Sequence, residues 1–268
     1  MNSPVKYYGG KSNMTGILSR MFPSDYTVYV EGFGGGASLL LSEERDGKVE
    51  VYNDLGQNVY SLFRVLSDNA LFKEFRAKCD LALYSKQLRD EYKESLRGEL
   101  STVERAYRFF YVNRASFNGV GGFSVSHYVR RGMCKSVSDF LSAVDGLPAL
   151  HDRLSRVVVE NRDIMEILDK YDHPDTFIYL DPPYVSSTRL SSTKYEEEMS
   201  DNDHRAMLEK CTSMKSRIMI SGYDNPFYDN ILKGWHKVIL PSGTVMTDTA
   251  EVVWMNYDPP APKEHGLF

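Results

Sequence analysis

The sequence has few cysteines and no long hydrophobic run. Its three cysteines, Cys79, Cys134 and Cys211, are widely spaced and form no C-x-x-C pair. An odd, scattered set is typical of reduced thiols in a cytosolic protein, which argues against a disulfide framework and against a zinc site. No stretch of about 18 consecutive apolar residues occurs, so no transmembrane helix is predicted. The first residues also lack the apolar segment of a signal peptide, so we expect a cytoplasmic protein that is not secreted.

Acidic residues are missing from one segment, residues 105–138. This segment holds six basic residues and no acid, a local charge of +6 with histidine neutral, although the whole chain carries a net charge of −5. Aromatic residues are interleaved with these cations, which is typical of a surface that binds phosphates and contacts bases. Tyr107, Phe110 and Tyr111 fit one helix face and are predicted to be core, whereas Phe117 lies outside the helical pattern. The segment therefore indicates a nucleic-acid partner despite the acidic average.

The rest of the chain alternates predicted strands with predicted helices. This rhythm is typical of an α/β fold with a parallel sheet and helices on its faces. Residues 68–149 break the rhythm with polar helices and a stretch rich in Gly and Ser that reads as a loop or hairpin. We predict one Rossmann-like α/β domain formed by residues 1–67 and 150–268, with a mostly helical module inserted at 68–149. The strands are expected within 27–33, 48–54, 156–163, 176–180, 217–223, 236–241 and 251–257.

Glycines cluster after the first predicted strand, in "VEGFGGGAS". They allow a tight turn before a helix whose N-terminal N–H groups are unpaired. Asp54 ends the next strand, about 20 residues on, where an acid accepts both ribose hydroxyls of a nucleoside cofactor. Gly32-x-Gly34-x-x-Ala37 meets the relaxed dinucleotide fingerprint, so NAD stays an alternative to S-adenosylmethionine, and a turn that binds nothing is a third reading. Glu31 favours S-adenosylmethionine, because a carboxylate attracts a sulfonium or amino group and repels a pyrophosphate.

The N-terminal stretch "KYYGGK", Lys6 to Lys11, precedes a predicted helix. Two glycines beside a lysine and a helix N-terminus form a cradle suited to a carboxylate or a phosphate, and a tyrosine there can cover an adenine or a methionine. The alternative is a flexible arm with a solvated lysine. The motif alone does not separate these two interpretations.

The stretch "TFIYLDPPY" leads a buried strand into a rigid turn. Asp181 follows the strand, at the edge where open α/β sheets bind ligands. The prolines stop further pairing, and Pro183 restricts Pro182 to extended conformations. If the Asp181 carboxylate and the Pro182 carbonyl accept both hydrogens of an exocyclic amine, the lone pair localises and attacks a methyl sulfonium in line. Tyr184 is suited to stack on the planar base.

Considered together, these motifs resemble those of the Dam-like DNA adenine-N6 methyltransferases. "KYYGGK" is similar to that family's N-terminal motif, "EGFGGGAS" to its glycine motif, and "YND" (52–54) to its acid segment. "NRASFNG" (113–119) is similar to the stretch that opens its recognition module. The match spans nearly the whole chain, in the family's order of cofactor region, recognition module and DPPY. The resemblance implies a site-specific enzyme that transfers a methyl group from S-adenosylmethionine to the 6-amino group of adenine in duplex DNA, by base flipping and direct in-line transfer.

The resemblance also implies partners and roles for particular residues. It implies double-stranded DNA as the partner, no metal, a monomer or weak dimer on DNA, and the cytoplasm of a bacterial, phage-infected or similar cell, within a restriction-modification system or as an orphan. Target-base residues are Asp181, Pro182, Pro183 and Tyr184. Cofactor residues are Tyr7, Gly10, Lys11, Glu31, Gly32, Phe33, Gly34, Gly36, Ala37, Ser38, Asp54, Asp163, Ile164 and Asp181. DNA-binding residues are Lys6, Arg114, Phe117 (which inserts into the duplex), Asn118, Tyr128, Arg130, Arg131 and Lys135.

One departure from the family affects the recognised site. After "FNG", the Dam members carry L-C-R-[YF]-N, whereas this chain has "VGGFSVSHYVRRG", so a GATC target is not implied. The polar stretch 186–203 is expected to form a mobile loop that closes over the base, with a plain solvated connection as the alternative.

Three other functions are alternatives to adenine methylation. An NAD-dependent dehydrogenase explains the glycine turn and Asp54 but neither DPPY nor the basic segment. A DNA-binding module with a relic site is the second, although all motif residues are present. Amine methylation of cytosine is the third, although family members with that activity usually begin the motif with Ser. Methylation of a pyrimidine carbon calls for a cysteine nucleophile, usually beside proline, and no cysteine of this chain follows a proline.

Overall fold

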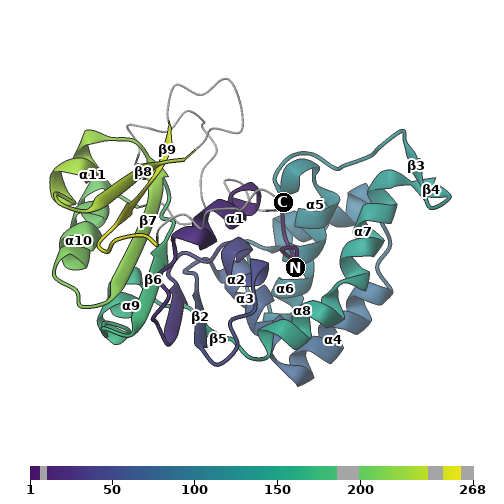
Figure 1. Ribbon diagram of the computed structural model, residues 1–268. Coiled ribbons are helices and arrows are strands. Elements are labelled where there is room, and N and C mark those ends of the chain that lie inside the picture. Colours follow the sequence, from purple (N-terminus) through teal and green to yellow (C-terminus); the bar gives the residue numbers. More distant parts are fainter. Residues whose placement is uncertain (7–10, 186–198, 241–249, 261–268) are drawn as a thin grey trace, which may run out of the picture. The chain divides into compact units, whose positions relative to one another are not determined.

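The computed structural model describes residues 1–6, 11–185, 199–240 and 250–260, and the chain divides into two compact units (Figure 1). The first unit comprises Met1–Ser12, Gly35–Glu44 and Gly56–Asn161, and the second comprises Asn13–Gly34, Arg45–Leu55 and Arg162–Phe268. Each unit is therefore assembled from separate stretches of the chain. The functional boundaries expected at 68 and 149 stay a prediction, because compactness alone does not say which residues bind DNA.

The second unit contains a mostly parallel sheet, with strands in the order β2-β1-β6-β7-β9-β8 (Figure 1). Strands β1, β2, β6 and β7 run parallel, and β9 pairs antiparallel with β7 and with β8. This mixed α/β architecture confirms the predicted fold class. The strands are β1 (Val28–Glu31), β2 (Val49–Asn53), β6 (Thr176–Leu180), β7 (Arg217–Tyr223), β8 (His236–Ile239) and β9 (Glu251–Met255).

Strand β6 lies inside the sheet because its side chains are apolar on both faces, as a parallel strand covered on both sides requires. All five of its residues are buried. Side chains alternate between the faces of a strand, so Ile178 and Leu180 point to one face and Phe177 and Tyr179 to the other. The same alternation places Tyr29 and Glu31 of β1 on the face of Phe177 and Tyr179, according to the register of the pair.

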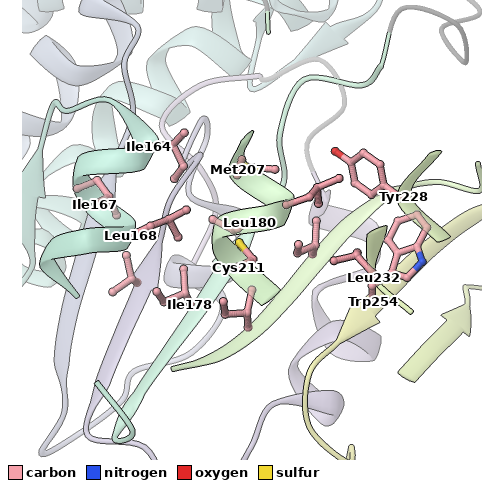
Figure 2. Close-up of a cluster of buried hydrophobic side chains, with 14 of the residues drawn as sticks. Ile164, Ile167, Leu168, Ile178, Leu180, Met207, Cys211, Tyr228, Leu232 and Trp254 are labelled. Carbon is pink, nitrogen blue, oxygen red and sulfur yellow. The ribbon is translucent and has the colours of Figure 1, made fainter. Parts of the chain in front are cut away.

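The face of Ile178 and Leu180 is covered by aliphatic side chains from helices. Figure 2 shows this cluster, in which buried residues of α9 and α10 surround the central strands and Trp254 of β9 closes one end. Burial of such side chains is the main source of stability in a domain of this size. The helices of the second unit are α1 (Thr15–Leu18), α9 (Ile164–Lys170), α10 (Asp201–Thr212) and α11 (Pro226–Ile231), with the 3₁₀ turn η2 (Ser19–Met21).

The opposite face of the sheet is aromatic. Phe177 lies 4.6 Å from Phe22 and 5.7 Å from Tyr29, measured between ring centroids, and Tyr26 and Tyr257 complete the group. The hydroxyl of Tyr257 donates to the carbonyl of Met21, so the segment after β9 is linked to η2 of the same unit. The two faces therefore differ in chemistry, because one is mainly aliphatic and the other is built from packed aromatic rings.

The first unit is mostly helical, as predicted for residues 68–149. Tyr107, Phe110 and Tyr111 are 8%, 0% and 0% exposed on α6, which confirms their prediction as core. Among the residues that the structure describes, no helix is long and apolar enough to cross a membrane. The elements are α2 (Ser38–Ser42), α3 (Gln57–Ser67), α4 (Asn69–Asp80), α5 (Lys86–Ser95), α6 (Thr102–Ala115), η3 (Phe117–Gly119), α7 (Lys135–Asp145), α8 (Leu147–Leu154) and the short strand β5 (Val158–Glu160), with η1 (Lys11–Asn13) where this unit passes into the second.

A β-hairpin precedes α7 and extends beyond the helices of this unit in Figure 1. It consists of β3 (Val129–Arg130) and β4 (Met133–Cys134), paired antiparallel. The two linking residues, Arg131 and Gly132, have φ of 55° and 73°. Two positive φ values are what a tight two-residue hairpin turn requires. The predicted loop or hairpin is therefore a hairpin, and Arg131 occupies a position that favours Gly or Asn.

Candidate functional site

The carboxyl ends of four parallel strands meet at one edge of the sheet in the second unit. Strands β1, β2, β6 and β7 run in the same direction, so the residues that end or follow them share this edge. Glu31 ends β1, Asp54 follows β2, Asp181 follows β6 and Tyr223 ends β7. In open α/β sheets this edge is where ligands bind. The structure therefore brings predicted cofactor residues and the DPPY turn to one edge.

Asp181 is held in place by a hydroxyl from the neighbouring strand. The Oγ of Ser221, on β7, donates to Oδ1 of Asp181 at 2.7 Å. The hydroxyl of Tyr179 lies 2.8 Å from the same Oγ. Since Ser221 has a single proton and directs it at Asp181, Tyr179 donates to Ser221. Tyr179 and Ser221 are 3% and 1% exposed, so the half-buried carboxylate rests on a buried pair of hydroxyls.

Tyr184 lies beside a second aromatic ring that the sequence did not single out. The ring of Tyr223 is 4.2 Å away between centroids, with an interplanar angle of 46°. The hydroxyl of Tyr184 donates to Oε1 of Glu251 at 3.4 Å. Each of these rings, next to the DPPY turn, has a face of the kind on which a planar base stacks. The only sequence signal for Tyr223 was its position at the end of a predicted strand.

Glu31 belongs to a chain of buried polar contacts. The hydroxyl of Tyr29 donates to Oε1 of Glu31 at 3.2 Å, and Glu31 is 3% exposed. Burial, followed by the charge of Glu31, raises the pKa of Tyr29, so its hydroxyl stays protonated and remains a donor. The guanidinium of Arg45 lies 4.2 Å from the Tyr29 ring centroid and pairs with Glu50 at 3.1 Å. A buried cation thus lies behind the ring that orients Glu31.

The glycine turn is shaped by packing within the protein. A Cβ on Gly32 would lie 2.6 Å from the Leu180 side chain and 2.8 Å from that of Ile164. A Cβ on Gly34 would lie 2.1 Å from the Tyr52 ring. Both distances are far shorter than van der Waals contact, so these glycines let the turn approach its own sheet and α9. Steric freedom for a ligand is not what these two positions require.

Asn53 ties this turn to the segment before α9, and the sequence analysis did not identify it. Its Nδ2 donates to the carbonyls of Gly32 and Arg162 at 2.9 and 3.1 Å, and its Oδ1 accepts from the Arg162 N–H at 2.9 Å. The N–H of Gly34 donates to the Asn53 carbonyl at 2.7 Å. Buried amides with several partners stiffen a site. Its place beside Asp54 in "YND" was the available signal.

The remaining predicted cofactor residues have varied surroundings. Asp163 is the N-cap of α9, where its Oδ1 accepts from the Met165 N–H at 2.8 Å. Asp54 and Phe33 are half-buried, and Lys11 is 6% exposed. In the first unit, Gly36 and Ala37 are buried and Ser38 opens α2; Ala37 has a φ of 53°. Tyr7 and Gly10, and most of the predicted loop 186–203, lie outside the described residues.

The predicted DNA-binding residues in η3, in the hairpin and at the start of α7 are exposed. Tyr128 and Phe117 are 77% and 65% exposed, and Asn118 adopts the left-handed conformation with a φ of 50°. Arg130 and Lys135 both pair with Asp139, at 2.6 and 2.5 Å. Arg131 reaches Asp145 at 3.9 Å. The acid-free segment therefore meets acids from α7 in the fold, and the surface charge is lower than the count of +6 suggests.

Two predicted DNA-binding residues make contacts inside the first unit. The guanidinium of Arg114 donates to the carbonyls of Pro4 and Ser3, both at 2.7 Å. The ammonium of Lys6 lies 3.4 Å from the Ser116 carbonyl, and burial, followed by the charge of Arg114, lowers the pKa of Lys6. Arg105 and Arg108, which contribute to the charge count, donate to groups of their own unit as well. These cations are engaged with protein groups.

Comparison with known proteins adds information that the geometry does not contain. A family model described as "D12 class N6 adenine-specific DNA methyltransferase" matches residues 7–247. The type II methyltransferase M1.LlaDCHI of Lactococcus lactis subsp. cremoris is 23% identical over 259 residues, covering 87% of this chain and 86% of that protein. M.MjaIII of Methanocaldococcus jannaschii is 23% identical over 262 residues, covering 87% and 88%. The DNA adenine methylase of Haemophilus influenzae is 22% identical over 243 residues, covering 86% and 82%.

Proposed function

Because the chain belongs to the D12 class N6 adenine-specific DNA methyltransferase family, we propose that it transfers a methyl group from S-adenosylmethionine to the 6-amino group of adenine in duplex DNA, at a specific site. The observation that carries this proposal is the oriented carboxylate of Asp181, held by Ser221 beside the rings of Tyr184 and Tyr223. The resemblance seen in the sequence motifs assigns the target base to the same turn, Asp181 to Tyr184.

The residues at the sheet edge suit S-adenosylmethionine. Glu31 is a buried carboxylate at this edge, which matches a cationic amino group or sulfonium and opposes a pyrophosphate. Asp54 is half-buried and placed to accept ribose hydroxyls, and Asp163, at the N-cap of α9 in the same unit, is proposed to lie near the adenine. When bound, S-adenosylmethionine would supply an electrophilic methyl group, and the broken sulfur–methyl bond would leave neutral S-adenosylhomocysteine as the product. Tyr7, Gly10, Lys11 and the turn 31–38 complete the proposed cofactor residues.

The proposed chemistry depends on two acceptors in the DPPY turn. The Asp181 carboxylate and the Pro182 carbonyl accept the two hydrogens of the adenine amino group, so its lone pair localises on nitrogen. Ser221 restricts the rotation of the Asp181 carboxyl group, which keeps one oxygen committed to the protein and orients the carboxylate. Tyr184, with Tyr223 beside it, stacks on the base. After transfer, the nitrogen loses one proton, for which the Asp181 carboxylate is the nearest proposed acceptor.

The base must leave the duplex before it can reach such a turn. The exposed hairpin and Phe117 in the first unit are the proposed DNA contacts, with Phe117 filling the gap left by the base. Arg130, Arg131 and Lys135 supply the phosphate-binding charge. The acids paired with them are partly exposed (Asp139) and exposed (Asp145), so phosphates can replace these acids at small cost. We further propose that the protein acts in the cytoplasm, as a monomer or weak dimer on DNA.

A methyl-transfer assay tests the proposal. The protein is incubated with S-adenosylmethionine labelled in its methyl group and with genomic DNA that lacks methylation, and the nucleosides are then separated. We expect the label in N6-methyladenine, with loss of on the order of 10³-fold in rate for Asp181→Ala. Label in N4-methylcytosine would show that the same transfer to an exocyclic amine takes place on cytosine and not on adenine. Binding of NAD without S-adenosylmethionine, or full activity of Asp181→Ala, would contradict the proposal.

A further inference from the structure

Asn113, at the end of α6, holds the N-terminal arm, which we define as Ser3–Lys6. Its Oδ1 accepts from the Lys6 N–H at 2.8 Å, and its Nδ2 donates to the Lys6 carbonyl at 2.9 Å. Asn113 is 5% exposed. A side-chain amide that pairs with both main-chain groups of one residue takes the role of a neighbouring strand, because backbone groups removed from water need partners.

Arg114 makes the second contact with the same arm. Its Nε donates to the Pro4 carbonyl and its Nη2 to the Ser3 carbonyl, both at 2.7 Å. Two donors of one planar guanidinium thus bind two successive carbonyls, a geometry that the single ammonium of a lysine does not reproduce. Burial lowers the pKa of Arg114 to about 10. The two hydrogen bonds direct the side chain into the unit, toward the arm.

Gly119 makes the third contact possible. Its φ is +83°, and a Cβ there would lie 2.2 Å from the Lys6 carbonyl oxygen and 2.8 Å from Nδ2 of Asn113. A larger residue would push the arm away and disturb the amide that holds it. Three contacts from one short stretch, "NRASFNG", thus converge on an arm more than 100 residues earlier in the chain.

We propose that Asn113, Arg114 and Gly119 are positioning residues that hold the N-terminal arm, and that this hold is needed for binding of S-adenosylmethionine at Lys11, which follows the arm in the chain. Their effect is then on cofactor binding and not on phosphate contact. The inference rests on the proposed function, which assigns Tyr7 and Lys11 to the cofactor. It replaces the expectation that Arg114 contacts DNA.

Three variants of the full-length protein test the inference. Asn113→Asp keeps the shape but removes the Nδ2 donor, Arg114→Lys keeps the charge but removes the fork, and Gly119→Ala adds the clashing Cβ. Arg131→Gly is the matched control, because it removes an exposed cation at a φ of 55° that glycine adopts freely. For each protein, hydrogen exchange of the arm, the affinity for S-adenosylmethionine and the salt dependence of DNA binding are measured.

We expect the three variants to exchange faster in the arm and to bind S-adenosylmethionine about tenfold more weakly, as the loss of a hydrogen bond implies. Their slope of log affinity for DNA against log salt stays that of the wild type. Arg131→Gly should lower that slope by about 0.9 and leave the arm unchanged.

Two results together would contradict the inference. Arg114→Lys would keep the wild-type hydrogen exchange of the arm and the wild-type affinity for S-adenosylmethionine, and Arg114→Gln would lower the salt slope of DNA binding. Arg114 would then be a phosphate contact. If thermal melting shows that Gly119→Ala does not fold, Asn113→Asp and Arg114→Lys alone test the inference. If the wild type binds no S-adenosylmethionine, the proposed function fails, whereas hydrogen exchange still reports whether these residues hold the arm.

Discussion

In the second unit, the acids at the sheet edge accept hydrogen bonds from buried hydroxyls, whereas in the first unit the hairpin cations pair with acids in solvent. Asp181 is held by Ser221, and Glu31 by Tyr29. Arg130 and its partner Asp139 have side chains that are 51% and 35% exposed. Buried contacts of this kind keep one geometry, and exposed ion pairs exchange partners easily. The acids at the sheet edge therefore have a fixed geometry, whereas the hairpin cations can exchange their partners.

The largest expected effect comes from breaking the buried ion pair between Arg45 and Glu50, in which Arg45 lies against the ring of Tyr29. Glu50→Ala removes the carboxylate that pairs with the buried Arg45 at 3.1 Å, and the two side chains are 6% and 3% exposed. We expect a loss of about 3–5 kcal/mol in the free energy of unfolding, measured by denaturant titration. Glu94→Ala is the matched control, because Glu94 and its partner Arg97 are 71% and 76% exposed. It should change stability by less than about 0.5 kcal/mol, and equal losses in both variants would remove the contrast between the regions.

The next effect concerns catalysis. Ser221→Ala removes the hydroxyl that orients Asp181, and a hydrogen bond to a charged group is worth about 1.5–3 kcal/mol. We expect at least a roughly tenfold slower methyl transfer in single-turnover experiments, with unchanged affinity for DNA, because each 1.4 kcal/mol is about tenfold in rate.

The control for this variant is Ser216→Ala. Ser216 is 1% exposed, and within the described part of the chain its hydroxyl has no hydrogen-bond partner. Its loss should leave the rate unchanged, and Tyr179→Phe should give a smaller slowing than Ser221→Ala, because Tyr179 contacts the hydroxyl of Ser221, which in turn donates to Asp181. Identical rates for Ser216→Ala and Ser221→Ala would show that this hydroxyl does not orient the carboxylate.

A smaller effect is expected in the exposed region. Arg131→Gly should weaken DNA binding severalfold and reduce the dependence on salt by about 0.9 in the log–log slope, as the loss of one phosphate contact requires. The folding stability should stay the same or rise slightly, because glycine adopts a φ of 55° without strain. A salt slope equal to that of the wild type would show that the hairpin turn lies away from phosphates.

The smallest expected effect is the change in DNA affinity on replacing Asp139, the acid of α7 that pairs with Arg130 and Lys135. Although burial opposes it, hydrogen bonding to Lys135 and Arg130 lowers the pKa of Asp139, so this carboxylate is ionised at neutral pH and cancels part of the hairpin charge. Asp139→Asn should strengthen DNA binding about twofold to fivefold at low salt, with a steeper salt dependence. Weaker binding would mean that Asp139 holds Arg130 and Lys135 in the geometry that DNA requires.

Much of the fold was readable from hydrophobic patterns. The run "TFIYL" predicted a buried strand, and it is β6; the periodic aromatic residues of 102–115 predicted a helix with a core face, and that face is buried. The division of the chain into compact units was not readable, because Gly35–Glu44 and Gly56–Asn161 join one unit only through long-range packing. Local patterns report which face is apolar and not what covers it.

The site was predictable in its residue types and less so in its supporting contacts. Asp163 could have been recognised as an N-cap, since an acid before a helical run is a helix-start signal. Asn53, Tyr29 and Ser221 could not be recognised in their roles, because each acts on a residue that the fold brings beside it.

By itself, the sequence determined the order of strands and helices, the rigid DPPY turn at the end of a buried strand, and the motifs that the family match bears out. These depend on local chain chemistry and on hydrophobic periodicity. Only the tertiary structure decided which partner each polar group takes: Ser221 for Asp181, 40 residues away, and Pro4 for Arg114, 110 residues away. The physical reason is that a hydrogen bond acts over about 3 Å, and the chain separation of its partners leaves no trace in either local pattern.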